Sequence, residues 1–268
     1  MRLKRPRILP LRQMFKERRS AMIVYVLLRL LVVLILVAQA LNGNWENVFL
    51  CVLTLVLLTI PSLIETNTRI DIPDTLEIIM LVFIFAAEIL GEIRSYYVAI
   101  PFWDTMLHTL NGFLAAAIGF SLVDILNQSE RFSFRLSPLF VAIVAFCFSM
   151  TIGVAWEFFE CAMDLVAGTD MQKDTIRNVI RSVTLDPTHS QHVVVVDGIR
   201  NVAVNGKDLG LGGYLDIGLY DTMLDLFVNF VGALVFSVAR FFYVKHRKTN
   251  SFLARFIPTL VDRDKEQG

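Results

Sequence analysis

Residues 138–165 read PLFVAIVAFCFSMTIGVAWEFFECAMDL, an apolar run in which the first charged side chain is Glu157 and the next is Glu160. Its length and hydropathy suit an α-helix that crosses a bilayer, which needs roughly 20 apolar residues. Glutamates three residues apart project from the same helical face. The stretch therefore predicts a membrane-spanning helix with two carboxylates near one end.

The composition of the whole chain agrees with a membrane protein. Of the 268 residues, 55% are hydrophobic and 19% are charged, and the mean hydropathy is +0.60. A single soluble core of this length needs less apolar surface. We therefore predict an all-α membrane protein with six transmembrane helices, at about 21–41, 46–64, 75–93, 104–127, 138–165 and 220–244.

Basic residues at both ends set the predicted orientation. Residues 1–20 contain many Lys and Arg against one acid, Glu17, and the tail begins Lys245-His246-Arg247-Lys248. Cytoplasmic segments of membrane proteins carry an excess of Lys and Arg. We expect five segments: a basic cytoplasmic amino terminus (1–20), the first five spans (21–165), an extracytoplasmic insertion (166–219), the sixth span (220–244) and a cytoplasmic tail (245–268).

The first span admits a second interpretation. The basic stretch before it and the Ala38-Gln39-Ala40 triplet after it resemble a signal peptide with its cleavage site. The apolar stretch is long for a signal, however, and an even number of spans agrees better with two basic ends. The terminal charges are suited to anionic lipid headgroups, so we expect membrane lipids and no nucleic acid as partners.

Acids and a histidine recur at helical spacing in the later spans. Asp104 and His108 are four residues apart, and Asp221, Asp225 and Asn229 follow the same spacing. Ionisable groups inside hydrocarbon are costly and usually mark a functional site. In the predicted orientation these groups lie near the outer ends of their helices. We expect one outward-facing site made of Asp104, His108, Glu157, Glu160, Asp221 and Asp225, with Asn229 and Glu88 around it.

The predicted site contains carboxylates and an imidazole but no thiolate. These ligands suit a divalent cation such as Mg²⁺, Mn²⁺ or Zn²⁺. In a metal-free alternative, His108 is a general base oriented by Asp104, and the acids handle protons. Asp104 and Asp221 also begin their helices, where a carboxylate can simply cap free backbone amides.

The insertion and the cysteines give weaker indications of structure and function than the acids and the histidine of the spans do. Val193 to Gly198 and Asn201 to Gly206 combine β-branched residues with turn dipeptides, which predicts a small β-hairpin. The insertion is either a surface elaboration or a lid over substrate. His189 and His192 lie in it and are expected to be solvated. The three scattered cysteines predict apolar packing and no disulfide framework: Cys51, Cys147 and Cys161.

Three motifs combine these groups with tryptophans and glycines: Trp103-Asp104-x3-His108-x3-Gly112, Trp156-Glu157-x2-Glu160 and Asp221-x3-Asp225-x3-Asn229-x2-Gly232. They resemble the signatures of the YjdF-like bacterial inner-membrane proteins and, more distantly, those of the VanZ-like membrane proteins. The resemblance covers about residues 75–244 and implies a bacterial plasma membrane. The long insertion departs from the compact connection that the resemblance leads us to expect.

The function hypotheses belong to three classes. The first is a metal-assisted hydrolase or transferase that acts on a lipid-linked or other envelope component, with His108 and Asp104 as the catalytic pair. No nucleophile motif accompanies them. The second is a small proton- or cation-coupled carrier. The third is a membrane scaffold in which buried polar groups only hold helices together. The sequence does not indicate the oligomeric state.

Overall fold

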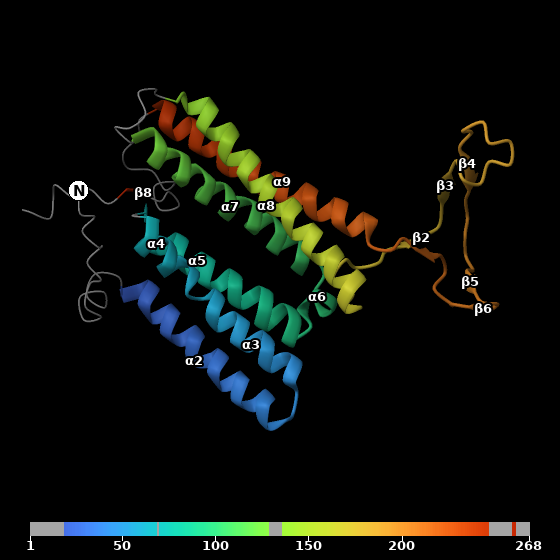
Figure 1. Cartoon of the computed structure of the whole chain (residues 1–268), viewed down its shortest axis with the longest axis horizontal. Helices are drawn as coiled ribbons and strands as arrows, with labels where there is room; N and C mark the ends of the chain where they lie inside the picture. The colour runs from blue at the N-terminus through green and yellow to red at the C-terminus, as the bar shows by residue number, and fades with distance from the viewer. Residues whose placement is uncertain (1–18, 69, 129–135, 247–258, 261–268) are drawn as a thin grey trace, which may run out of the picture. The chain divides into compact units, whose positions relative to one another are not determined.

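The computed structural model describes residues 19–68, 70–128, 136–246 and 259–260 (Figure 1). The helices are α2 (Arg19–Leu41), α3 (Trp45–Leu57), α4 (Ile60–Thr68), α5 (Asp74–Phe85), the π-helix η1 (Ala86–Ile93), α6 (Tyr96–Ala99), α7 (Trp103–Gln128), α8 (Pro138–Ala167) and α9 (Leu219–His246). The strands are β1 (Ile70–Asp71), β2 (Ile176–Arg177), β3 (Ile180–Ser182), β4 (Val194–Val196), β5 (Ala203–Val204), β6 (Lys207–Asp208), β7 (Tyr214–Leu215) and β8 (Thr259–Leu260).

The chain divides into two compact units. Unit 1 consists of Met1–Ile152 with Val228–Gly268, and unit 2 consists of Gly153–Phe227. Helices α8 and α9 contribute residues to both units. Each unit is described by itself below.

Among the residues that the structure describes, five helical segments are long and apolar enough to cross a membrane. They are Arg19–Leu41, Trp45–Thr66, Trp103–Val123, Pro138–Val166 and Leu219–Phe242. The span expected at 75–93 is not among them. The chain there forms α5 followed by η1, and these two helices together carry four acids: Asp74, Glu77, Glu88 and Glu92. Five of the expected spans thus have helical counterparts, and the sixth crossing stays a prediction.

The first core of unit 1 lies among α2, α3, α5 and η1, where Leu28, Val32, Cys51 and Leu81 are buried together. Figure 1 shows α2 and α3 side by side. Burial of Cys51 agrees with its predicted packing role, whereas Cys147 is exposed.

Two contacts in unit 1 join segments distant in sequence. Strands β1 and β8 are antiparallel, with Ile70 opposite Leu260. Ser20 Oγ, at the start of α2, donates to Asp74 Oδ2, at the start of α5 (3.4 Å). The carboxyl-terminal strand therefore lies beside the connection between α4 and α5, as expected if both face one side of the membrane. Residues 1–18 and most of the predicted tail lie outside the described residues.

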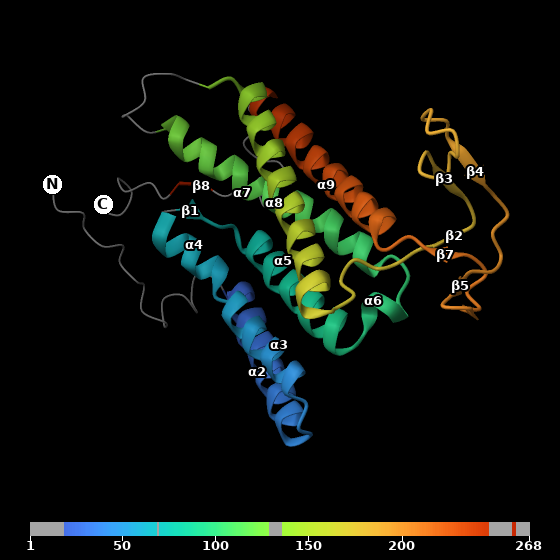
Figure 2. The same cartoon turned by 45° about the vertical axis from the view of Figure 1, so that its right-hand side comes forward.

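The second core of unit 1 contains α5 and α7 with the unit 1 parts of α8 and α9. In the view of Figure 2, α7 passes behind α8. Alanines at the contacts allow close helix packing: Ala116, Ala117, Ala145 and Ala233. At one edge, the Arg240 guanidinium lies 4.0 Å from the centre of the Phe120 ring.

Helices α7 and α9 approach each other backbone to backbone within unit 1. A Cβ atom at Gly112 would overlap the carbonyl of Asn229, and one at Gly232 would overlap the carbonyl of Thr109. Beside these glycines, Asn111 Nδ2 donates to Asn229 Oδ1 (3.3 Å). Glycines let the two backbones approach closely, and an amide bonds across the interface, as is common where membrane helices pack.

Unit 2 contains the insertion, and its strands pair differently from the prediction. The predicted hairpin between 193–198 and 201–206 is wrong, because β4 pairs with β3 and β5 pairs with β6. A tight turn does form at Asn205 and Gly206, whose φ values of 52° and 80° are typical of a type I′ hairpin turn. The turn dipeptide thus closes its own short ribbon, while the valine run pairs with an earlier strand.

Candidate functional site

Three acids of unit 2 form a buried cluster, here called the triad. Glu157 and Glu160 of α8 and Asp225 of α9 each offer a carboxylate oxygen, and these oxygens lie within 4.8 Å of one another. The three residues are 4%, 7% and 2% exposed. The structure therefore brings together the acids of two separate sequence motifs.

Helix spacing and one hydrogen bond position the triad. Glu157 and Glu160 lie on one face of α8 because they are three residues apart. Trp156 Nε1 donates to Glu160 Oε1 (2.8 Å), and the indole packs against the Phe159 ring. Trp156 was predicted only as part of a motif, although its four-residue separation from Glu160 indicates this contact. The tryptophan orients one carboxylate of the cluster.

Asp221, predicted as a ligand, accepts a backbone hydrogen bond in unit 2. Its Oδ2 accepts a hydrogen bond from the backbone amide of Lys173 (2.8 Å), and the residue is not one of the triad. On α8, Asp164 has a similar role, since its carboxylate accepts from the amides of Met171 (2.6 Å) and Gln172 (2.8 Å). Both acids hold the segment that follows α8.

Asp104 and His108 form a pair on α7, in unit 1. His108 Nε2 lies 3.4 Å from Asp104 Oδ1, across one helical turn. The imidazole is buried, whereas the carboxylate is 32% exposed. This geometry suits an imidazole that a carboxylate orients, which is the arrangement predicted for proton transfer.

The two outer residues of the predicted site lie in unit 1. Asn229 is fully buried, and its Nδ2 donates to the Ser149 carbonyl (3.5 Å). Ser149 Oγ in turn donates to the Gly112 carbonyl (2.7 Å). Asn229 therefore acts in helix packing. Glu88 lies partly buried in η1, where Glu92, one turn further on, is exposed.

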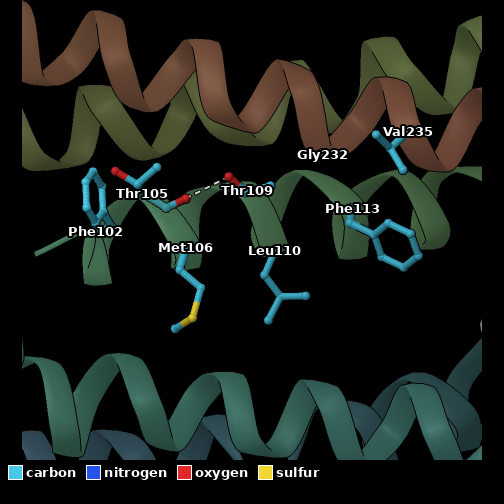
Figure 3. Close-up of a pocket in the computed structure, with 8 residues that line it drawn as sticks. All are labelled: Phe102, Thr105, Met106, Thr109, Leu110, Phe113, Gly232 and Val235. Atoms are coloured by element: carbon cyan, nitrogen blue, oxygen red, sulfur yellow. Dashed lines mark hydrogen bonds between the residues drawn. The ribbon is translucent and has the colours of Figure 1, made fainter.

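A groove of about 480 Å³ runs along α7 within unit 1 (Figure 3). Thr109 Oγ1 donates to the Thr105 carbonyl on its wall (2.7 Å). The lining is otherwise largely apolar: Phe102, Met106, Leu110, Phe113, Gly232 and Val235. Neither Asp104 nor His108 lines it. The groove suits a hydrocarbon chain better than an ion.

Aspartates of the insertion hold its loops. Asp186 accepts hydrogen bonds from Thr188, Ser190 and His192, which lowers its pKa to about 2. His192 itself is exposed, as is His189, in agreement with the prediction that both are solvated. These contacts join residues within one short loop, so Asp186 organises the loop locally.

Asp216 connects the two ends of the insertion. Burial favours its neutral form, but hydrogen bonds from Thr175, Tyr220 and Gly218 outweigh burial and lower its pKa. Asp174 behaves oppositely, since burial and then the charges of neighbouring acids raise its pKa.

Comparison with known proteins gives the family. A family model described as "Predicted membrane protein (DUF2238)" matches residues 22–247. The chain belongs to the DUF2238 family. Similarity extends to an uncharacterized protein from Thermotoga maritima, 26% identical over 106 residues, which are 40% of this chain. The alignment spans 53% of that relative. No solved structure matches the chain.

The DUF2238 match includes both units. It begins near the start of α2 and ends just beyond α9, so it contains the triad, the pair on α7 and the insertion. Membership supports a membrane protein with several apolar helices.

Proposed function

We propose that the triad binds a divalent cation and that the protein is a multi-pass bacterial plasma-membrane protein acting on a lipid-linked or other envelope component. The observation that carries the proposal is the burial of three carboxylates whose oxygens lie within 4.8 Å of one another. Like charges this close repel, and desolvation adds to the cost. A cation compensates both.

The dimensions of the triad suit one ion. Mg²⁺ binds oxygen at about 2.0–2.1 Å and Ca²⁺ at about 2.3–2.6 Å, so ligands on opposite sides of one ion are about 4–5 Å apart. The triad oxygens lie within 4.8 Å of one another. Carboxylate ligands without thiolates favour Mg²⁺ or Mn²⁺, and Zn²⁺ becomes a suitable ion as well when a histidine is among the ligands.

The proposal includes Asp104 and His108 as the proton-handling pair and Asp221 as an additional acid. When bound, the cation would polarise a phosphoryl or carbonyl oxygen of the substrate. His108 would move a proton, and Asp104 would hold the imidazole in the orientation that this transfer needs. Asn229 and Glu88 are included in the proposal as supporting residues. The activity would then be metal-assisted hydrolysis or transfer.

The proposed orientation has both termini in the cytoplasm and the insertion outside, with a sixth crossing formed by α5 and η1. The terminal basic residues support it, as does the pairing of β1 with β8. A Ser190→Cys variant should react with a membrane-impermeant thiol reagent added to intact cells. Reaction only after the cells are opened would contradict the orientation and the envelope substrate. The YjdF-like resemblance agrees with this arrangement, and the VanZ-like relation is part of the proposal.

Thermal unfolding in detergent tests the cation. A ligand that binds only the folded state at a hundredfold excess over Kd adds about 2.7 kcal/mol to the free energy of unfolding. Chelation should therefore lower the Tm of the wild type and leave Asp225→Asn nearly unchanged. Asp197→Asn, at an exposed aspartate of the insertion, is the matched control and should respond as the wild type does.

A proton- or cation-coupled carrier is the second candidate, because closely spaced buried carboxylates can also share protons. If chelation leaves the Tm of the wild type unchanged while His108→Gln abolishes function, the carrier replaces the metal enzyme. A scaffold would instead tolerate both Asp104→Asn and His108→Gln. Loss of function in cells with either variant separates the scaffold from the other two classes.

A further inference from the structure

A short segment of unit 2 bridges α8 and α9 directly beside the triad. Asp164 lies four residues after Glu160 and seven after Glu157, so it continues their face of α8. Asp221 lies four residues before Asp225 and continues its face of α9. Each of these acids is about 6 Å from the triad along its helix, toward the insertion, at about 1.5 Å rise per residue.

Three consecutive residues connect these two acids. The amides of Met171 and Gln172 donate to the two oxygens of Asp164, and the amide of Lys173 donates to Asp221 Oδ2. The Gln172 side chain donates from Nε2 to Thr222 Oγ1 (2.6 Å). The backbone of 171–173 therefore crosses between the helices one turn above the triad.

We propose that Met171–Lys173 is a lid over the cation site, held closed by Asp164, Asp221 and Thr222. This inference rests on the proposed function, since it assigns the lid to the same site. The closed lid excludes water from the triad, which strengthens the attraction between the acids and a cation. A cation that enters the site attracts the carboxylate oxygens of Asp164 and Asp221, which accept hydrogen bonds from the lid amides. As the cation enters, these oxygens lose their hydrogen bonds to the amides and gain contacts with the cation.

The ends of the segment suit this role. Gly168, just after α8, has a φ of +67° and no atom within 4 Å of a Cβ placed on it, so the chain turns there in open space. At the other end, Thr175 is fixed by its amide and hydroxyl to Asp216 (3.0 and 2.8 Å). Gly218 lies so close to Gln172 that a Cβ on the glycine would overlap that residue. One end can hinge while the other is anchored.

The rate at which the purified protein releases bound Mn²⁺ into excess chelator tests the lid. Thr222→Val removes the acceptor for Gln172, and Gln172→Ala removes the donor. Each should speed release about fivefold or more, as the loss of one hydrogen bond from the closed state predicts. The amount of Mn²⁺ bound at saturation should not change. Thr184→Val, at an exposed threonine of the insertion, makes the same chemical change as Thr222→Val and should release Mn²⁺ at the wild-type rate.

The outcomes separate the lid from the proposed function. If the wild type and both variants bind Mn²⁺ and release it at one rate, the lid is wrong and the cation site stands. If the wild type binds no Mn²⁺, Mg²⁺ or Zn²⁺ at all, the proposed function is wrong and the lid with it. Equal acceleration in Thr184→Val would show a general loosening of the insertion and would also overturn the lid.

Discussion

Unit 1 and unit 2 each bury a polar cluster between helices, but the clusters differ in charge. In unit 1, Asn111, Ser149 and Asn229 are neutral and bond to one another or to helix carbonyls. In unit 2, Glu157, Glu160 and Asp225 are all acids. A neutral cluster can be satisfied by the helices themselves, whereas three carboxylates need protons or a cation. Closely packed buried acids in a membrane protein therefore indicate function more strongly than buried amides and hydroxyls do.

The largest expected effect concerns the neutral cluster. Gly112→Val should destabilise the protein by about 3 kcal/mol or more, because the new side chain meets the Asn229 backbone, which cannot move aside easily. Thermal unfolding in detergent, with chelator and with divalent cation, should show the same loss in both conditions.

The control for this variant is Gly43→Ala. A Cβ at Gly43 meets no atom within 4 Å, so the substitution adds only the strain of a left-handed backbone, about 1–2 kcal/mol. A Gly112→Val protein as stable as Gly43→Ala would contradict the close approach of α7 and α9.

The second prediction concerns the charge of the triad. Glu157→Gln removes one of three like charges, so it should raise the Tm or leave it unchanged when chelator is present. With divalent cation present at a hundredfold excess over the wild-type Kd, the variant should lack most of the roughly 2.7 kcal/mol that the wild type gains. Tm measurements under both conditions would detect this change of sign. The same destabilisation with and without cation would mean that Glu157 acts only in packing.

The third prediction contrasts a neutral site with the triad. Asn111→Ala removes the hydrogen bond to Asn229 and should cost about 0.6–1 kcal/mol, the usual range for hydrogen bonds between membrane helices. The loss should be equal with and without chelator. A loss that depends on cation would show that the neutral cluster belongs to the functional site after all.

The smallest effect is expected in the insertion, away from both clusters. Because the folded-state pKa of Asp186 is lowered to about 2, its hydrogen bonds stabilise the 186–192 loop above the unfolded pKa of about 3.9 and lose this effect as pH falls toward 2. Pepsin cleavage in this loop should therefore increase as pH falls from 4 to 2. In Asp186→Ala, cleavage should be high throughout; a wild-type profile in that variant would contradict the assigned role.

The sequence predicted the long helices and the paired acids because both depend on local regularities. Apolar length marks a span, and Glu157 with Glu160 share a face by spacing alone. The contact of Gly112 with Asn229 was not predicted, because it depends on which helices become neighbours and not on spacing within one helix.

Other features depend on contacts that spacing does not encode. Strand β4 pairs with β3, from an earlier part of the insertion. The sequence did not predict this partner, because backbone pairing depends little on the side chains of so short a strand. Asp221 lies near the start of a helix and has the spacing of a ligand. Its carboxylate accepts a hydrogen bond from the Lys173 amide, and in this way it anchors the lid. The pairing of β8 with β1 joins residues that are far apart in the chain, so no local sequence pattern predicts it.

The most direct test of the cation site is the metal content of the purified protein. Wild type and Asp225→Asn would be purified in detergent, equilibrated with equal Mg²⁺, Mn²⁺ and Zn²⁺, freed of loose ions and analysed by mass spectrometry of the elements. The account predicts near-stoichiometric divalent metal in the wild type and a loss of most of it in Asp225→Asn, with Asp197→Asn like the wild type. Metal absent from the wild type, or retained equally in Asp225→Asn, would contradict the account.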